Sequence, residues 1–546
     1  MKILKYILFS FILFQACKDP EMIGEDPYAG GKDPLGVKFK DANPSPKSGV
    51  PGDQVLFKVD GLEKYRDQVE FYINEERADI VEMTDSTVKV IVPELVSTGG
   101  VSAVINGEVV FGPRFVINGK IAANTNNNIT TGFYYKGMTD DGRSLQGRGT
   151  VYDHLALSSS SHLYAGLFTD YNSLAVVQDP INGLVNLNNQ GDRLSDVKSY
   201  IGVEGGSLRS IHRLSSGKLI VSGTFTKYEG DVLASGITRL RSNGELDTMS
   251  IKVLNETDDP LNSLDTVPAF NGNIAGTILK SFLINDNGKE KIICIGNFNT
   301  YYKYRYDFRP TREIKRLELR SIDNALRLET DGTLDSAYNY DLNAKKGIGG
   351  ANGFINDAAI QEDNKVILVG KFTKFQNQNV ASGIVRLNNN GVVDPGFNVG
   401  TGANGEIVSI QYANGKILLT GMFSKFNGFD CNGVVMLEPD GTVVQSFHFR
   451  DIDEGVVTFA KLLSNGKVLV SGSFGKYDHV KRSGLLFLEQ DGSALQVYNN
   501  VGSFEGRIYN VYETTIAARK SVVIMGNIWR FDNKDVSGLL VLEVKD

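Results

Sequence analysis

Cysteine, histidine and tryptophan are scarce in this sequence. Its 546 residues include three Cys, five His and one Trp. Three scattered cysteines exclude a disulfide framework and a Cys-rich zinc site. None of the histidines forms a His-Glu-x-x-His pair, so no metal site is predicted. Excess positive charge is missing as well, because 57 Lys and Arg against 64 Asp and Glu give a net charge of −7. This balance argues against nucleic acid as a partner.

The amino terminus carries a short apolar run. Lys2 and Lys5 precede the run 6–14, and Ala16 and Cys17 follow it. The run is too short to span a bilayer, and the pattern is typical of a signal peptide over residues 1–16. A Cys after a small residue at this place resembles a bacterial lipobox. The resemblance implies that Cys17 is acylated and anchors the protein to a membrane; a stray cysteine is the alternative.

The segment 17–36 is rich in Gly, Pro and Asp, which predicts a flexible tether. It begins with Lys18-Asp19-Pro20-Glu21, a charged cluster that resembles the export signal of surface lipoproteins of Bacteroidetes. The resemblance implies that the protein is anchored in the outer membrane with its body on the extracellular face.

Residues 37–118 show short alternating strands separated by turn residues at intervals of roughly ten residues. The strands are expected at 54–59, 69–73 and 87–93. This pattern fits an immunoglobulin-like sandwich. With Asn43-Pro44-Ser45-Pro46 before the first strand and Gly99-Gly100 near the end, the segment resembles an IPT/TIG domain. Residues 119–149 are expected to be a linker.

A sevenfold repeat occupies residues 150–546. Its first signature is a Gly, an apolar residue two places on, and Tyr or Phe five places on; the glycines are Gly166, Gly223, Gly296, Gly370, Gly421, Gly472 and Gly526. A second Gly follows in six copies, and Asn324 takes its place in the third copy. Successive first glycines are 57, 73, 74, 51, 51 and 54 residues apart. Units of this length predict the four-stranded blades of a seven-bladed β-propeller, so the fold class is all-β. The repeat resembles the delta-60 repeat of bacterial surface proteins at 327–335 and 386–394.

Catalytic residues are not indicated, since no nucleophile elbow, P-loop or Cys/His pair occurs. Asp247, Asp335 and Asp394 recur at one place in three repeats. A catalytic carboxylate pair is one interpretation, and turn formation is the favoured one. No cofactor is predicted.

The third repeat carries an aromatic and basic insertion that is a candidate binding loop. Aromatic faces with Arg forks suit sugars or peptide carboxylates, and a hairpin that extends the blade is the alternative. The only Trp, Trp529, is a further candidate stacking platform. Lysines four residues after the first Gly in several blades could form a basic ring, with solvated turn lysines as the alternative. The candidate binding residues are Tyr301, Tyr302, Tyr304, Arg305, Tyr306, Arg309 and Trp529.

A lipid-anchored IPT/TIG domain followed by a propeller resembles the accessory lipoproteins of SusC/SusD-like importers. The resemblance implies a non-enzymatic binding or docking subunit that handles oligopeptide or glycan beside the importer. Because fold does not fix function, a propeller enzyme acting on glycans and a protein-binding adhesin remain alternatives.

Overall fold

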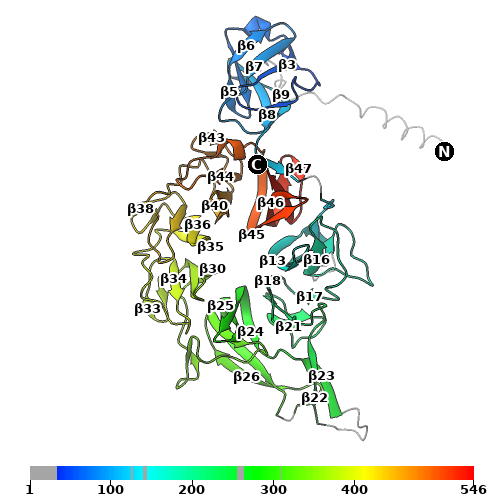
Figure 1. Ribbon diagram of the computed structural model, residues 1–546, viewed down its shortest axis with the longest axis vertical. Coiled ribbons are helices and arrows are strands. Elements are labelled where there is room, and N and C mark those ends of the chain that lie inside the picture. Colours follow the sequence, from blue (N-terminus) through cyan, green and yellow to red (C-terminus); the bar gives the residue numbers. More distant parts are fainter. Residues whose placement is uncertain (1–33, 125–126, 139–143, 255–262, 309, 546) are drawn as a thin grey trace, which may run out of the picture.

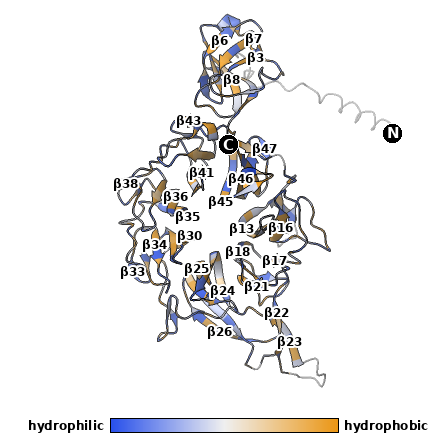
Figure 2. Ribbon diagram, in the orientation of Figure 1, coloured by the Kyte–Doolittle hydropathy of each residue, from blue (hydrophilic) through white to orange (hydrophobic). Residues whose placement is uncertain are grey.

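The computed structural model describes residues 34–124, 127–138, 144–254, 263–308 and 310–545. The predicted signal peptide, Cys17 and most of the predicted tether lie outside these residues. The described chain is all-β, with a two-sheet sandwich attached to a ring of radial sheets (Figure 1). Apolar residues gather along the strands of both parts (Figure 2). The predicted fold class is confirmed.

The sandwich has its core between two sheets. That core is rich in Phe and Val, including Phe57, Phe71 and Phe115, whose rings pack against one another. Inward and outward residues alternate along β3, as expected for a sheet with one buried face. One sheet has the order β1 (Lys38–Phe39), β3 (Gln54–Asp60), β7 (Thr87–Ile91), β6 (Ile80–Met83). The other has the order β2 (Ser48–Gly49), β9 (Glu108–Ile117), β8 (Gly99–Ile105), β4 (Val69–Ile73), β5 (Glu76–Ala78).

The ring contains seven blades within the described residues, each built on three consecutive antiparallel strands. The inner strands are β13 (Thr150–Ser158), β18 (Leu208–Arg213), β24 (Asn273–Asp286), β30 (Phe354–Ile360), β35 (Glu406–Ala413), β40 (Val457–Leu462) and β45 (Phe504–Ile516). The second strands are β14 (Ser161–Leu167), β19 (Leu219–Gly223), β25 (Lys289–Arg305), β31 (Val366–Lys371), β36 (Lys416–Met422), β41 (Val468–Gly472) and β46 (Arg519–Phe531). The third are β16 (Leu184–Asn188), β21 (Ile237–Leu240), β27 (Ala325–Glu329), β34 (Ile384–Leu387), β39 (Val434–Leu437), β44 (Leu485–Leu488) and β48 (Leu539–Val544).

The second strands are buried on both faces, because each blade is packed between two others. β41, for example, reads Val-Leu-Val-Ser-Gly and is buried throughout. Such continuous apolar runs are what a strand covered on both sides requires.

The expected fourth strand of each blade is reduced in the first six blades. After the turn that follows the third strand, the chain returns through a single bridge, as between Leu488 and Ala494. Among the described residues, the seventh blade is the one in which a regular fourth strand pairs with the third strand. This fourth strand is β10 (Ile121–Ala123), which pairs with β48.

The segment 119–149 is therefore not the linker that the sequence led us to expect. Ile121 is buried in the core of the seventh blade, and its strand closes the ring between the beginning and the end of the propeller sequence. β11 (Phe133–Met138) and β12 (Ser144–Arg148) pair with each other, and β11 also pairs with β15 (Asp170–Tyr171) of the first blade. Because these strands lie outside the repeat, the sequence pattern did not predict them.

Glycine is needed at the two repeat positions because the two residues are joined by a backbone hydrogen bond and because the backbone of the inner strand passes close to the first of them. The N–H of Gly223 donates to the carbonyl of Gly236 at 2.8 Å, and the equivalent bond is present in all seven blades, with Asn324 taking the place of the second Gly in the third. The second Gly needs a positive φ, which is +70° at Gly236. A Cβ on Gly223 would lie 2.1 Å from the carbonyl oxygen of Ser207. Sequence signature and backbone geometry thus agree.

Every inner strand has a β-bulge at the same place, opposite the first repeat Gly. In β13 the register skips Tyr152 between Val151 and Asp153. Because a bulged residue is re-aimed relative to its strand, each blade presents one such side chain to the centre of the ring. The seven residues, all lining one small cavity there, are Tyr152, Arg209, Leu279, Asn356, Val408, Thr458 and Tyr509.

The sandwich is fixed to the sixth and seventh blades. The N–H and hydroxyl of Thr98 both donate to the carbonyl of Asn500, at 2.9 and 2.7 Å. Glu75 pairs with Lys481 at 2.9 Å and with Lys476 at 3.3 Å, and Arg114 pairs with Asp532. These bonds attach the sandwich to the ring.

Further short strands and one hairpin are attached to the blades. The hairpin β22 (Thr248–Lys252) and β23 (Leu264–Pro268) and the strand β26 (Arg316–Ser321) lie on the opposite side of the ring from the sandwich (Figure 1). The short pieces on the blades are β17 (Val203–Glu204), β20 (Lys227–Tyr228), β28 (Tyr340–Asp341), β29 (Lys346–Gly347), β32 (Lys374–Phe375), β33 (Gln378–Asn379), β37 (Lys425–Phe426), β38 (Phe429–Asp430), β42 (Lys476–Tyr477), β43 (Val480–Lys481) and β47 (Lys534–Asp535). Two single-turn 3₁₀ helices span Glu63–Tyr65 and Gln496–Tyr498.

Candidate functional site

The predicted aromatic loop is an extension of β25, which pairs with β26 from Thr300 to Arg305. The hairpin alternative is therefore the one the structure shows. Tyr301 is buried, and its hydroxyl donates to the carbonyl of Gly332 at 3.0 Å. Tyr301 is thus a structural residue of the repeat, and its proposed place in a binding surface was wrong.

The other tyrosines of β25 pack against neighbouring elements. The hydroxyls of Tyr302 and Ser235 are 2.7 Å apart, and the ring of Tyr304 meets that of Tyr302 edge to face. Tyr306 lies on the small apolar cluster of the β22–β23 hairpin, and burial raises its pKa. The three rings therefore hold the insertion to its own blade.

The remaining predicted binding residues do not form a common binding surface with these tyrosines. Arg305 pairs with Asp307 at 2.9 Å, and its hydrogen bonds lower the pKa of that carboxyl to about 2. Arg309 lies outside the described residues. Trp529 is 51% exposed, but it is on the seventh blade and β25 is on the third, so the predicted residues do not form one site.

The basic ring is also neutralised in part. Lys425 pairs with Asp430 at 2.7 Å, Lys476 with Glu75, and Arg530 with Glu505 at 3.7 Å. These three side chains act in local pairs and in the sandwich contact, and Lys227 and Lys374 are the members of the ring without a carboxylate partner among the described residues.

The recurrent aspartates are turn-stabilising. Asp247, Asp335 and Asp394 lie on three different blades, and each accepts a short bond from the arginine eight residues before it, at 2.7, 2.6 and 2.8 Å. Burial raises their pKa, but the Arg and Lys beside each one outweigh it and the pKa falls below its ordinary value. The three do not form a catalytic pair. Within the described ranges no three His, Cys, Asp or Glu side chains are grouped to hold a metal.

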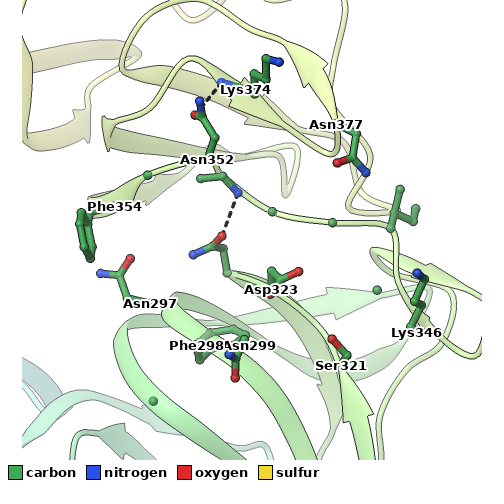
Figure 3. Close-up of a pocket in the computed structure, with 18 of the residues that line it drawn as sticks. Asn297, Phe298, Asn299, Ser321, Asp323, Lys346, Asn352, Phe354, Lys374 and Asn377 are labelled. Carbon is green, nitrogen blue, oxygen red and sulfur yellow. Dashed lines mark hydrogen bonds between the residues drawn. The ribbon is translucent and has the colours of Figure 1, made fainter.

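An open groove of about 720 Å³ lies between the third and fourth blades. One wall comes from the middle of β25 and from the end of β26 with the loop after it, and the other from the loop 346–353 and the start of β30 (Figure 3). Phe354 stands at one end and Lys346 at the other. The groove is mainly polar, with Asn299, Ser321 and Asp323 facing Asn352, Lys374 and Asn377.

Three asparagines hold the walls in place. The carbonyl oxygen of Asn324 accepts from the N–H of Ala351 at 2.9 Å, while its amide donates to Gly296 at 2.8 Å. Asn352 accepts from the N–H groups of residues 373 and 374, both at 2.9 Å. Asn297 exchanges two bonds with the backbone of Ile355, at 2.8 and 3.0 Å. The groove is therefore preformed.

The groups left to meet a ligand are an aromatic ring, amides and charges. Phe354 is 70% exposed although it begins an inner strand. The ammonium groups of Lys346 and Lys374 have no carboxylate partner in the part of the chain that the structure describes. Burial raises the pKa of Asp323. An exposed ring beside unpaired polar groups is a binding arrangement.

This groove was not among the predicted sites, although the sequence carries a signal for it. The spacing of 74 residues between Gly296 and Gly370 marks an enlarged repeat. The aromatic run accounts for only the first part of it. The remainder forms the Gly-rich loop 346–353 that lines the groove.

Two domain families match parts of the chain. Residues 15–113 match "Domain of unknown function (DUF5008)". Residues 214–248, 361–397 and 413–447 match "Domain of unknown function (DUF5122) beta-propeller". The second match falls on the second, fourth and fifth blades and agrees with the ring described above. Comparison with curated proteins gives no match.

Solved structures similar to the chain include propellers and nutrient-binding proteins. The WD40 β-propeller domain of Doa1 is 14% identical with a TM-score of 0.38, over 76% of this chain and 98% of that one. An auxiliary nutrient binding protein from Bacteroides thetaiotaomicron is 12% identical with a TM-score of 0.25, over 93% and 98%. Another from Bacteroides ovatus is 9% identical with a TM-score of 0.23, over 93% and 97%.

Helices able to cross a membrane are not found among the residues described.

Proposed function

We propose that the protein is a lipid-anchored surface protein that binds oligosaccharide without chemical conversion, as an accessory subunit of a SusC/SusD-like outer-membrane importer. The observation that carries the binding role is Phe354, a 70% exposed ring at the end of a preformed polar groove. The flat face of a sugar stacks on such a ring, while its hydroxyls exchange hydrogen bonds with amides and charged groups.

The groove favours binding over hydrolysis. Glycosidases use two carboxyl groups about 5–10 Å apart across the bond that is broken. Asp323 is the one carboxylate among the described residues that line the groove. Oligosaccharide is preferred to oligopeptide because amides, a hydroxyl and two ammonium groups outnumber apolar side chains there.

Phe354→Ala tests the binding role. Screening the protein against neutral and acidic oligosaccharides and against peptides, followed by calorimetric titration, should give a ligand whose affinity falls at least tenfold in the variant. The control is Met422→Ala, since Met422 is 59% exposed at the end of β36 and lies outside the groove. Equal affinity in Phe354→Ala and the unaltered protein would remove the groove from the proposal.

Cys17→Ser tests the anchor. The variant is expected in the soluble fraction, and the unaltered protein in the outer membrane, where added protease should reach it from outside. Purification of the anchored form in mild detergent should bring a SusC/SusD-like pair with it. A protein that is purified alone would leave the binding role intact but contradict the importer assignment.

A further inference from the structure

Two arginines in the central channel have no carboxylate partner among the residues that the structure describes. Arg209 is the bulged residue of β18, and Arg507 lies in β45 two residues before the bulged Tyr509. Both line a small cavity at the centre of the ring, to which all seven inner strands contribute. A second cavity of about 250 Å³ continues from it and shares Tyr152, Arg209 and Tyr509.

Each guanidinium is held over a tyrosine ring. The guanidinium carbon of Arg209 is 4.6 Å from the ring centre of Tyr152, and that of Arg507 is 5.1 Å from that of Tyr509. The two rings meet edge to face with centres 4.7 Å apart. Stacking fixes the plane of a guanidinium and leaves its N–H donors free at the edge.

The donors of Arg209 include one that lacks an acceptor. Its Nε is buried and has no hydrogen-bond partner in the described part of the chain. A buried donor without a partner is costly, at about 1–3 kcal/mol, and such groups are rare unless a ligand or water completes them. Arg209 therefore lines the channel with a guanidinium that the protein groups described by the structure do not fully satisfy.

The nearby carboxylates are already engaged. Asp153 accepts from the N–H of Ile211 at 3.1 Å and from the amide of Asn510 at 3.2 Å. Asp357 pairs with Lys280 at 2.7 Å and accepts from the N–H of Ile410 at 3.0 Å. These bonds tie neighbouring blades together around the channel, so neither acid neutralises the arginines.

We propose that the channel binds a carboxylate group, held by Arg209 and Arg507, with the hydroxyls of Tyr152 and Tyr509 as further donors. Guanidinium forks match carboxylates in shape and charge. A uronic acid and the carboxyl terminus of a peptide offer the same chemistry. This proposal goes beyond the groove and does not depend on it. The two sites adjoin along β30, where Phe354 lines the groove and Asn356 lines the channel.

Calorimetric titration of the full-length protein at low salt tests the proposal. The probes are trigalacturonate, neutral galactotriose, and one tripeptide with either a free or an amidated carboxyl terminus. We expect trigalacturonate or the free peptide to bind, the matching neutral probe to bind at least tenfold more weakly, and added salt to weaken the interaction. Trigalacturonate alone would identify a sugar acid, and the free peptide alone a peptide terminus. Failure of both to bind would overturn the proposal.

Single substitutions locate the site. Arg209→Gln and Arg507→Gln should each lower the affinity for the bound probe at least tenfold. Arg213→Gln, on the same strand β18 but outside the cavities, should not change it. Arg507 is exposed, so its variant stays informative even where Arg209→Gln is less stable. Phe354→Ala should leave this binding in place, which separates failure here from failure of the groove. Unchanged affinity in both arginine variants would contradict the assignment.

Discussion

The hydroxyl of Tyr301 donates to the carbonyl of Gly332 at 3.0 Å, and this bond recurs around the ring. It links Tyr171 to Gly191 at 2.6 Å, Tyr228 to Gly244 at 3.3 Å and Tyr477 to Gly492 at 2.5 Å. In each case a buried tyrosine five residues after the first repeat Gly, within the second strand or just beyond it, reaches the turn that follows the third strand. Where the last residue of the repeat signature is Tyr, it is therefore a clamp on that turn.

Tyr301→Phe should lower the free energy of unfolding by about 1–3 kcal/mol, because it leaves a buried carbonyl without its donor. Tyr304→Phe is the matched control on the same strand, where the ring is only half-buried. Denaturant titration measures both. A Tyr301→Phe protein as stable as the control would contradict the clamp.

Gly472→Ala should be destabilising by roughly 1–3 kcal/mol, the usual cost of forcing atoms into a packed region. A Cβ at this position would lie 2.1 Å from the carbonyl oxygen of Val456, just before the inner strand β40. At Gly147, by contrast, nothing lies within 4 Å of an added Cβ, so Gly147→Ala should have little effect. Thermal melting of the two variants makes the comparison.

Ile121→Ala should cost about 2–5 kcal/mol, the range for removing a buried aliphatic side chain. Ile121 is 1% exposed and packs in the core of the seventh blade. Ile314→Ala is the control, since that side chain is 73% exposed. A mild effect at Ile121 would mean that the ring is stable without its closing strand.

Asn500→Ala should loosen the sandwich from the ring. The side chain donates to the carbonyls of Ile117 and Ile121, at 3.2 and 3.0 Å. Calorimetry is expected to show a single unfolding transition in the unaltered protein and two in the variant. Asn118→Ala, which removes only an exposed bond to Ser48, should keep the single transition. Coincident melting in Asn500→Ala would show that the other contacts suffice.

Acid should weaken the contact between the first and seventh blades. His154 stacks on Tyr512 with ring centres 3.7 Å apart. Burial, with His162 and Lys461 nearby, lowers the pKa of His154 to about 3 from an ordinary value of 6.5. The unfolded chain therefore takes up a proton that the folded chain refuses, so stability is lost as the pH falls from about 6.5 toward 3.

His154→Phe keeps the stacked ring but cannot be protonated. Its melting temperature relative to the unaltered protein should rise as the pH is lowered from 7.5 to 4. The same substitution at the exposed His448 is the control. Parallel pH profiles for His154→Phe and the unaltered protein would exclude this histidine as the origin of acid sensitivity.

The repeat was readable from the sequence because its signals are local. Gly223 and Gly236 are required by a backbone bond and a positive φ, and apolar runs such as 468–470 mark strands covered on both faces. β10 could not be predicted from the sequence, because its three residues lie outside the repeat signatures and are recognised as a strand only by their pairing with β48. The aromatic run misled because composition does not show which ring is buried: Tyr301 is buried, whereas the ring of Phe354 is 70% exposed. Arg209 lines the channel because it is the bulged residue of β18, and the spacing of residues in the sequence does not reveal a bulge.

The pairing of β10 with β48 also sets an order for biogenesis. A nascent chain delivers β10 long before β48, at about 5–20 residues per second, so the first six blades can stack while the ring is still open. Closure is the last event. A product cut short before β48 would retain an open arc with unpaired sheet edges, which invite aggregation and proteolysis. Because β10 follows the sandwich directly, the pairing that closes the ring also fixes the ring relative to the sandwich. Closure of the last blade is therefore the step that separates a finished molecule from an open one.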